Sequence, residues 1–119
     1  MLKSLMNNIF YMIFKKPNNN SELNNILETY DKILFQFSAN WCAPCKRITP
    51  EVKKYTQSIE NDSLCYCYID VDKLEEFSNS REIVSIPTFM VYEKQSNSFI
   101  DKITSSDIEV IKQFCEKIA

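Results

Sequence analysis

The sequence predicts a single α/β domain of 119 residues. Segments with apolar residues at every third or fourth position alternate with short continuous apolar runs, which is the pattern of helices packed on a buried sheet. The polar turn Gln95–Ser98 separates the last two apolar runs and predicts an antiparallel hairpin. With 45% apolar and 13% aromatic residues, the chain is long enough and apolar enough to form one packed core.

The first apolar run, Ile9–Phe14, predicts a buried first strand. A targeting segment or membrane anchor is the alternative. Asn7 and Asn8 interrupt the apolar stretch, no small-residue cleavage site follows, and a membrane helix needs roughly 20 residues. We therefore expect no membrane segment, with residues 1–8 as an N-terminal extension to a domain spanning 9–119, and leave organellar targeting by the first residues open.

A helix and a second buried strand are predicted next. Ser21 can cap the helix, whose apolar residues form one stripe: Leu23, Ile26, Leu27 and Tyr30. Asp31 and Lys32 end it. The continuous apolar run Ile33–Phe37 then predicts a strand that is buried on both faces.

Two cysteines mark the transition from this strand to the following helix. Cys42 lies near the helix start and Cys45 one turn further, before apolar residues at helical spacing: Ile48, Val52, Tyr55 and Ile59. A thiolate at a helix N-terminus faces unpaired N–H groups and the positive end of the helix dipole, so it ionises more easily. Pro50 falls inside the helix and should bend its axis.

The second half of the chain continues the alternation. The predicted elements are a buried strand (63–71), a short helix (74–81), a strand (85–92), a last strand (99–103) and a closing helix that Ser105 or Ser106 caps. Pro87 stands near the start of its strand, where proline is tolerated. The closing helix has an inner stripe of Ile108, Ile111, Cys115 and Ile118. We interpret Asp70 and Asp72 as a solvated strand end and not as a metal site.

The composition excludes several classes of function. Histidine is absent, which removes Ser–His–Asp and Cys–His catalysis and histidine-ligated metals. Glycine is absent, which removes glycine-rich phosphate-binding loops. The net charge of −2 gives no basis for a nucleic-acid partner, which usually needs a basic face.

The five cysteines favour a reducing compartment with one working pair over a secreted disulfide framework, because their number is odd and the core is adequate. Cys65 and Cys67 share one face of a strand, and with Cys115 we interpret them as small core residues. The rival is a four-cysteine zinc site formed by Cys42, Cys45, Cys65 and Cys67. Two cysteines separated by one strand residue suit that geometry poorly, so we expect no metal.

The segment Trp41-Cys42-Ala43-Pro44-Cys45-Lys46 resembles the active site of the thioredoxin family. Three further landmarks lie at compatible distances: Pro50, Asp70-Val71-Asp72 and Ile86-Pro87-Thr88-Phe89. The resemblance extends from about Ile9 to the C-terminus. It implies the thioredoxin fold, with a central mixed sheet of about five strands flanked by about four helices.

The resemblance also implies roles for the two cysteines. Cys42 would be the nucleophile that attacks a partner's disulfide, and Cys45 would resolve the mixed disulfide. The activity would be reduction of client-protein disulfides, with a thioredoxin reductase or an equivalent electron donor restoring the pair. No cofactor beyond the Cys42–Cys45 disulfide is implied. We expect a cytoplasmic monomer.

The neighbouring residues would support this chemistry. Pro44 stiffens the loop between the cysteines, and Trp41 forms an apolar wall beside the sulfur. Lys46 has a minor electrostatic effect on the thiolate. Pro87, cis in the family, would face the cysteines, and the Ile86 backbone would pair with an extended substrate segment.

Two residues depart from the family pattern. Ala43 stands where glycine is usual, which should change the redox potential slightly and leave the chemistry unchanged. Gln36 stands where many thioredoxins carry a buried aspartate that takes the proton from the resolving thiol. Glutamine cannot act as a base, so we predict slower resolution by Cys45.

Two other functions remain open on the same fold. A disulfide oxidase or isomerase is one, although such enzymes tend to place histidine before the second cysteine, where this chain has Pro44. The other is a binding or scaffold module with weak redox activity, which the missing buried acid leaves open.

Overall fold

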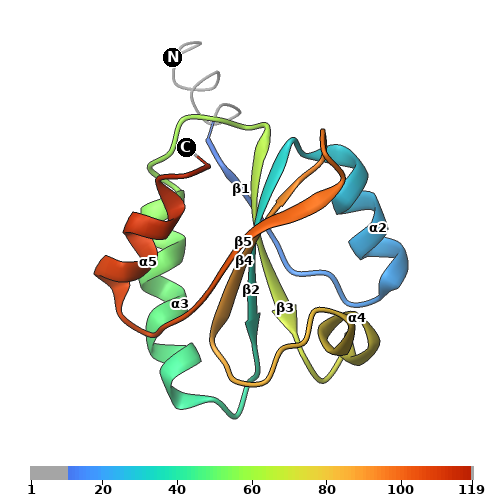
Figure 1. Cartoon of the computed structure of the whole chain (residues 1–119). Helices are drawn as coiled ribbons and strands as arrows, with labels where there is room; N and C mark the ends of the chain where they lie inside the picture. The colour runs from blue at the N-terminus through green and yellow to red at the C-terminus, as the bar shows by residue number, and fades with distance from the viewer. Residues whose placement is uncertain (1–10, 119) are drawn as a thin grey trace.

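The computed structural model describes residues 11–118 of the chain (Figure 1). Its elements are, in order, β1 (Ile13–Lys15), α2 (Asn20–Thr29), β2 (Lys32–Ser38), α3 (Ala43–Thr56), β3 (Leu64–Asp70), α4 (Glu75–Ser80), β4 (Thr88–Glu93), β5 (Ser98–Thr104) and α5 (Ile108–Cys115). This order confirms the predicted alternation and the final hairpin. The predicted extension, residues 1–8, lies outside the described residues.

The five strands form one mixed sheet in the order β1-β3-β2-β4-β5. β1, β3 and β2 are parallel, whereas β4 is antiparallel to β2 and β5 is antiparallel to β4. β2 and β3 therefore lie inside the sheet, and both are buried along almost their whole length. The chain leaves the middle of the sheet at the end of β2, which brings the cysteine pair to the edge where two parallel strands end.

Helices cover both faces of the sheet (Figure 1). α3 and α5 pack against one face, over a cluster that includes Leu34, Tyr66 and Phe89. α2 and α4 cover the other face, where the cluster includes Phe35 and Cys67. Because side chains alternate along a strand, Gln36 points to the same face as Leu34 and so toward α3.

Two predicted helix caps are wrong. Asn19, rather than Ser21, caps α2, and its side-chain oxygen accepts a hydrogen bond from the N–H of Glu22 at 2.9 Å. Asp107, rather than Ser105 or Ser106, caps α5 by accepting from the N–H of Glu109. Asparagine and aspartate are as good at this position as serine, so sequence preference alone does not select among adjacent candidates.

Several predicted boundaries also shift. β1 begins at Ile13, so the strand is shorter than the predicted Ile9–Phe14, of which residues 9 and 10 lie outside the described part. β4 begins at Thr88, directly after Pro87, because residues 85–87 do not take part in the strand pairing. Helix α3 contains Pro50 as predicted and ends at Thr56, before Ile59.

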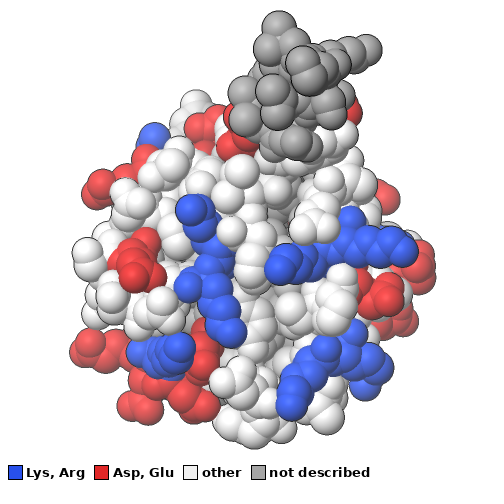
Figure 2. Space-filling model, turned by 180° about the vertical axis from the view of Figure 1, so that it is seen from behind, with Lys and Arg blue, Asp and Glu red and all other residues white. Residues whose placement is uncertain are grey.

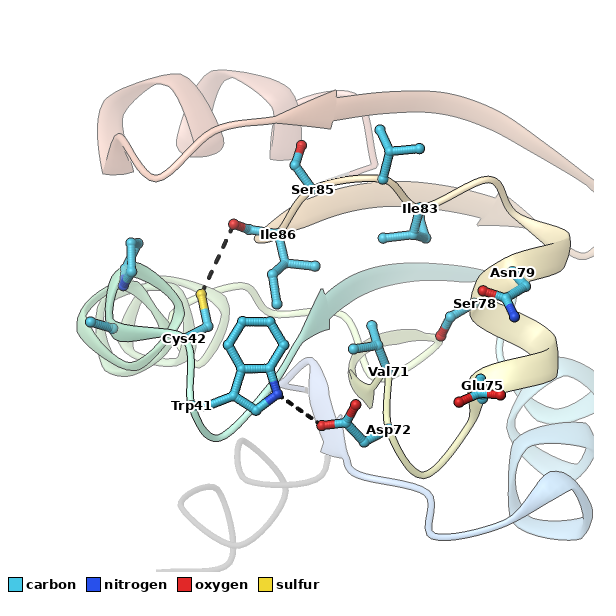
Figure 3. A pocket seen from close by; sticks show the side chains of 13 residues that line it. Trp41, Cys42, Val71, Asp72, Glu75, Ser78, Asn79, Ile83, Ser85 and Ile86 are labelled. Carbon is cyan, nitrogen blue, oxygen red and sulfur yellow. Dashed lines mark hydrogen bonds between the residues drawn. The ribbon is translucent and has the colours of Figure 1, made fainter.

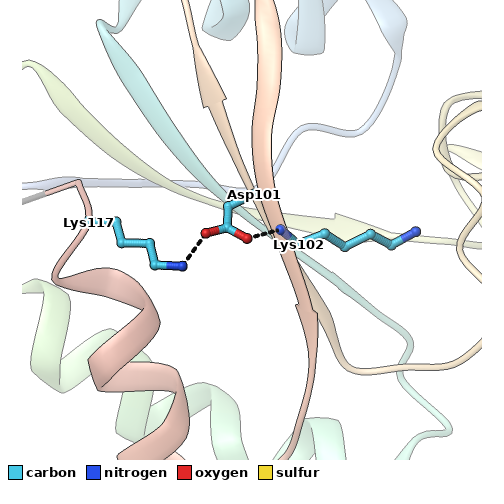
Figure 4. A network of polar contacts seen from close by, with 3 residues as sticks. All are labelled: Asp101, Lys102 and Lys117. Carbon is cyan, nitrogen blue, oxygen red and sulfur yellow. Dashed lines mark hydrogen bonds and ion pairs between the residues drawn. The ribbon is translucent and has the colours of Figure 1, made fainter.

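Polar contacts join the turn after α5 to the edge strand β5. The Nζ of Lys117 donates to the Oδ2 of Asp101 on β5, and the backbone N–H of Lys102 donates to the Oδ1 of Asp101 at 2.8 Å (Figure 4). The hydrogen bond from Lys117 is the main cause that lowers the pKa of Asp101 below its usual value. The side chain of Lys102 extends to the other side and donates to the carbonyls of Arg81 and Glu82.

The surface seen from behind mixes both signs of charge. Lys and Arg side chains lie there in separate groups, with Asp and Glu side chains between and around them (Figure 2). This face therefore does not present one continuous basic field. Among the helices of residues 11–118, none is long and apolar enough to cross a membrane.

Candidate active site

The two cysteines of the predicted pair form a disulfide at the start of α3. Cys42 is the N-cap residue of this helix, and the N–H of Cys45 points to its Sγ at 3.3 Å. The Cα atoms of the two residues are 5.2 Å apart. Cys42 is 6% exposed, whereas Cys45 is completely buried. Only the first of the two sulfurs therefore borders the surface.

The first turn of α3 is built to receive negative charge at Cys42. Ala43 and Pro44 occupy the first two helical positions, where the missing N–H of proline costs no hydrogen bond. The first backbone bond of the helix runs from the N–H of Lys46 to the carbonyl of Cys42, at 3.0 Å. The remaining N–H groups and the dipole of this 14-residue helix favour ionisation of a reduced Cys42.

The segment before β4 lies next to the disulfide. The Ile86–Pro87 peptide bond is cis. The carbonyl oxygen of Ile86 is 4.0 Å from the Sγ of Cys42, as the dashed line in Figure 3 shows. Ile86 also packs against a small buried cluster of Ala39, Cys42 and Cys45. Backbone from a distant part of the chain is thus placed beside the exposed side of the sulfur.

Trp41 stands on the surface beside the cysteines. Its side chain is 70% exposed, and its Nε1 donates a hydrogen bond to the Oδ2 of Asp72 at 3.0 Å (Figure 3). Asp70 is 4% exposed and accepts hydrogen bonds from the N–H groups of Asp72 and Lys73. The interpretation as a solvated strand end is therefore wrong for Asp70, which is buried and fixes the turn that holds Asp72 against the indole. Asp72 itself is exposed, as predicted.

A groove of about 820 Å³ opens beside Cys42. The loop after β2 and the start of α3 form one end, and α4 forms the other. Its apolar lining comes from Trp41, Val71, Ile83, Val84 and Ile86, and Asp72 and Glu75 also line it. The contributions of α4 and of residues 83–85 were not predicted, because these residues carry no motif of their own.

Gln36 lies behind the disulfide, in the core between the sheet and α3. It is completely buried, and its Nε2 donates to the hydroxyls of Ser38 at 2.8 Å and Thr49 at 2.7 Å. Its Oε1 accepts a hydrogen bond from the hydroxyl of Tyr66. The side-chain amide is therefore fully paired. Thr49 and Tyr66 had not been predicted as part of the site, because only the three-dimensional arrangement brings them to Gln36.

The other three cysteines are free and buried. Burial raises the pKa of Cys65 and of Cys115 to about 12 and raises that of Cys67 well above its usual value. Cys65 and Cys67 pack in the cluster beneath α2 and α4. In residues 11–118, no three acidic or cysteine side chains gather as a metal site would require, and the rival four-cysteine zinc site is not assembled, since Cys42 and Cys45 bond to each other.

The structure thus brings five of the predicted site residues to one groove: Trp41, Cys42, Ala43, Pro44 and Ile86. Cys45 lies buried beneath them, and Pro87 is buried directly after Ile86. Two others lie elsewhere. Gln36 contacts the first turns of α3 from inside, and the side chain of Lys46 is exposed and does not line the groove.

Comparison with known families gives a match to the thioredoxin family model over residues 13–117. Thioredoxin 1 of Plasmodium falciparum is 30% identical over 99 residues, which cover 83% of this chain and 91% of the relative. The mitochondrial thioredoxin-3 of Saccharomyces cerevisiae is 31% identical over 90 residues, covering 76% of this chain and 69% of the relative.

A solved structure of Plasmodium falciparum thioredoxin superposes with a TM-score of 0.80 at 30% identity. The superposition covers 88% of this chain and 99% of that structure. The similarity therefore includes the sheet, all four helices within the matched range and the segment that carries Cys42 and Cys45.

Proposed function

The chain belongs to the thioredoxin family and is a thiol-disulfide oxidoreductase, and we propose that it works as a reductase of disulfides in client proteins. The observation that carries this proposal is the position of the Cys42–Cys45 pair at the N-terminus of α3, with one sulfur at the groove and the other buried. The family implies disulfide-containing substrates and a reductase as electron donor.

The reaction starts from the reduced pair. The Cys42 thiolate attacks one sulfur of the client disulfide and forms a mixed disulfide, while the other client sulfur leaves as a thiolate and takes up a proton. Cys45 then gives up its proton and attacks the Sγ of Cys42. This second step breaks the mixed disulfide and releases the second client thiol. The client gains two electrons and two protons, and Cys42 and Cys45 end joined, which is the state of the pair in the structure.

The positions of the two sulfurs support this division of roles. Cys42 has the N–H of Cys45 at 3.3 Å and the helix dipole to stabilise its thiolate, and it borders the groove where a client can reach it. Cys45 is completely buried, so a client disulfide cannot reach it first. The Cα atoms of Cys42 and Cys45 are nevertheless 5.2 Å apart, a separation that a disulfide spans.

The segment at Ile86 is suited to hold the client. It lies outside the strand pairing of β4, and its carbonyl is next to the Sγ of Cys42. An extended client segment that pairs with this backbone would place its own sulfur at Cys42, in the manner of strand addition. Trp41 and Val84, which are 70% and 96% exposed, offer apolar surface to the same segment.

Pro44 supports reduction over oxidation. A histidine at this position would stabilise the Cys42 thiolate and make the pair a stronger oxidant. Proline carries no charge and no donor. We further propose that the protein is a monomer and works in a reducing compartment. The three free cysteines favour such a compartment. The cytoplasm is one example, and one relative is named as mitochondrial.

A trapping experiment tests the proposal. In Cys45→Ser the mixed disulfide cannot be resolved, so client proteins should accumulate on Cys42 and separate from the protein again on reduction. Cys42→Ser is the matched control, because it removes the proposed nucleophile and leaves the buried sulfur in place. Reduction of insulin by the wild-type protein, with a dithiol as electron donor, measures turnover. Equal trapping by both variants, or no insulin reduction, would refute the proposed roles.

A further inference from the structure

The groove beside Cys42 has an uneven distribution of charge. Ile83, Ser85 and Ile86 form one side of it, and Trp41, Asp72 and Glu75 lie on the opposite side in Figure 3. Asp72 and Glu75 are the two charged residues among those that line the groove, and both are acidic. The apolar surface next to the reactive sulfur is thus bordered by two carboxylates.

The carboxylate of Asp72 is held in place. Its Oδ2 accepts the hydrogen bond from Trp41 Nε1, and Trp41 directly precedes Cys42 in the chain. Glu75 follows in the first turn of α4. Neither side chain takes part in the ion pairs found within residues 11–118. Both negative charges therefore remain available to a bound molecule.

The basic side chains nearest to Asp72 and Glu75 in the sequence are directed elsewhere. Lys73 extends to Asn18, with its Nζ 3.1 Å from the side-chain oxygen of that residue. The guanidinium group of Arg81 lies 4.6 Å from the ring centre of Phe99. Neither of them lines the groove, so the charged side chains that line it, among residues 11–118, are the two carboxylates alone.

From this charge complementarity we propose that the groove selects, among client disulfides, those whose flanking segment carries a lysine or arginine. An apolar side chain next to the client cysteine would pack against Trp41 and Ile86, and the basic side chain would reach Asp72 and Glu75. An acidic residue at the same place would be repelled. The inference rests on the proposed function, because the occupant of the groove is the client segment joined to Cys42.

Three matched disulfide peptides test the selectivity. The peptides differ at one residue near the reactive cysteine. This residue is lysine, glutamine or glutamate. Each set is made twice, with the varied residue before or after the cysteine. The prereduced protein is mixed with each peptide in a single turnover, so that no reductase is present. The fluorescence of Trp41, the single tryptophan of the chain, follows the oxidation of the pair.

We expect the second-order rate constant to fall from lysine to glutamine to glutamate for at least one placement. Two exposed carboxylates support a difference of about threefold to tenfold between the lysine and glutamate peptides. High ionic strength should reduce that ratio, because it screens exposed charges. Glu75→Gln should also reduce it. Glu76→Gln is the matched control, since it removes the same charge from the same helix outside the groove, and it should keep the ratio.

The outcomes separate the two proposals. Equal rates for the three peptides in both placements, or a faster glutamate peptide, would overturn the charge selection and leave the reductase function standing. A ratio that Glu76→Gln reduces as much as Glu75→Gln would assign the effect to net charge and overturn the role of the groove. Failure to reduce any of the peptides would refute the proposed function itself.

Discussion

The side-chain amide of Gln36 donates a hydrogen bond to the hydroxyl of Thr49, with Nε2 2.7 Å from Oγ1. Thr49 in turn donates to the backbone carbonyl of Cys45, again at 2.7 Å. A neutral amide therefore connects the centre of the sheet with the turn of α3 that carries the proposed resolving cysteine. Because an amide neither accepts nor releases a proton at neutral pH, this connection supports the position of Cys45 and not its deprotonation.

Gln36→Asp should accelerate the resolution step. A carboxylate at this place can act as a general base for the thiol of Cys45, an effect typically worth 10²-fold or more where the geometry is good; we expect about tenfold here because the aspartate side chain is shorter. The measurement is a single-turnover reaction at neutral pH that follows release of the client thiol. Gln36→Asn has the size of aspartate and no basic group, so it should show no acceleration.

The two variants together decide whether proton removal limits resolution. If Gln36→Asp and Gln36→Asn react at the same rate, the inferred deficit does not exist. Both variants shorten the side chain and disturb the contacts to Ser38 and Tyr66, so a loss of stability common to the two does not affect this comparison.

Tyr66→Phe should destabilise the protein by about 1 to 3 kcal/mol, the cost of leaving a buried acceptor unpaired. The hydroxyl of Tyr66 donates to the Oε1 of Gln36, which is completely buried and would lose this partner. Denaturant unfolding of the oxidised protein measures the change. Tyr68→Phe on the same strand is the control, because the Tyr68 hydroxyl makes no hydrogen bond within the described part of the chain. Equal losses would show that the contact with Gln36 contributes nothing.

Asp101→Asn should cost less than about 1 kcal/mol at neutral pH, since the pair with Lys117 is partly exposed. The contacts of Asp101 lower its pKa from the ordinary value of 3.8. The Asp101 carboxylate therefore stays ionised to a lower pH in the folded protein than in the unfolded chain. The contribution is therefore present above about pH 4 and lost as the pH falls through the lowered value. Unfolding of both proteins between pH 2 and pH 7 should show the difference vanish in acid. A difference that persists in acid would assign the effect to packing.

Much of the fold could be predicted because it depends on local patterns. The continuous apolar runs of β2 and β3 indicated strands buried on both faces, and the spacing from Ile48 to Tyr55 indicated α3. The helix caps were wrong because Asn19 and Asp107 compete with nearby serines for the same role. Where adjacent residues have similar capping preference, tertiary packing decides which of them caps the helix, and the sequence does not show that packing.

The site was predictable only where a motif marks it. The cysteine pair and Ile86–Pro87 came from the motif, and the structure places them together. The Trp41–Asp72 contact joins the loops after β2 and β3, and the partners of Gln36 come from β3 and α3. Such contacts join residues about 30 positions apart, as with Gln36 and Tyr66, and a single sequence carries no signal for them.

Cys115→Ala should make the stability of the protein less dependent on pH in the alkaline range. Burial raises the pKa of the Cys115 thiol from 9.0 to about 12, so between these values the unfolded chain loses a proton that the folded protein keeps. The contribution of this thiol to stability is therefore intact below about pH 9 and falls as the pH rises, by up to about 1.4 kcal/mol per pH unit.

At pH 7 the Cys115→Ala variant should be less stable than the wild type, because it loses buried volume in the core between α3 and α5. Unfolding in urea from pH 7 to pH 10.5 measures the difference in stability between the two proteins, which should narrow above pH 9. Tyrosines and the other thiols titrate in both proteins, so their effects cancel in this difference. A gap that stays constant across that range would mean that Cys115 titrates alike in the folded and unfolded chain, and the assigned effect of its burial would be wrong.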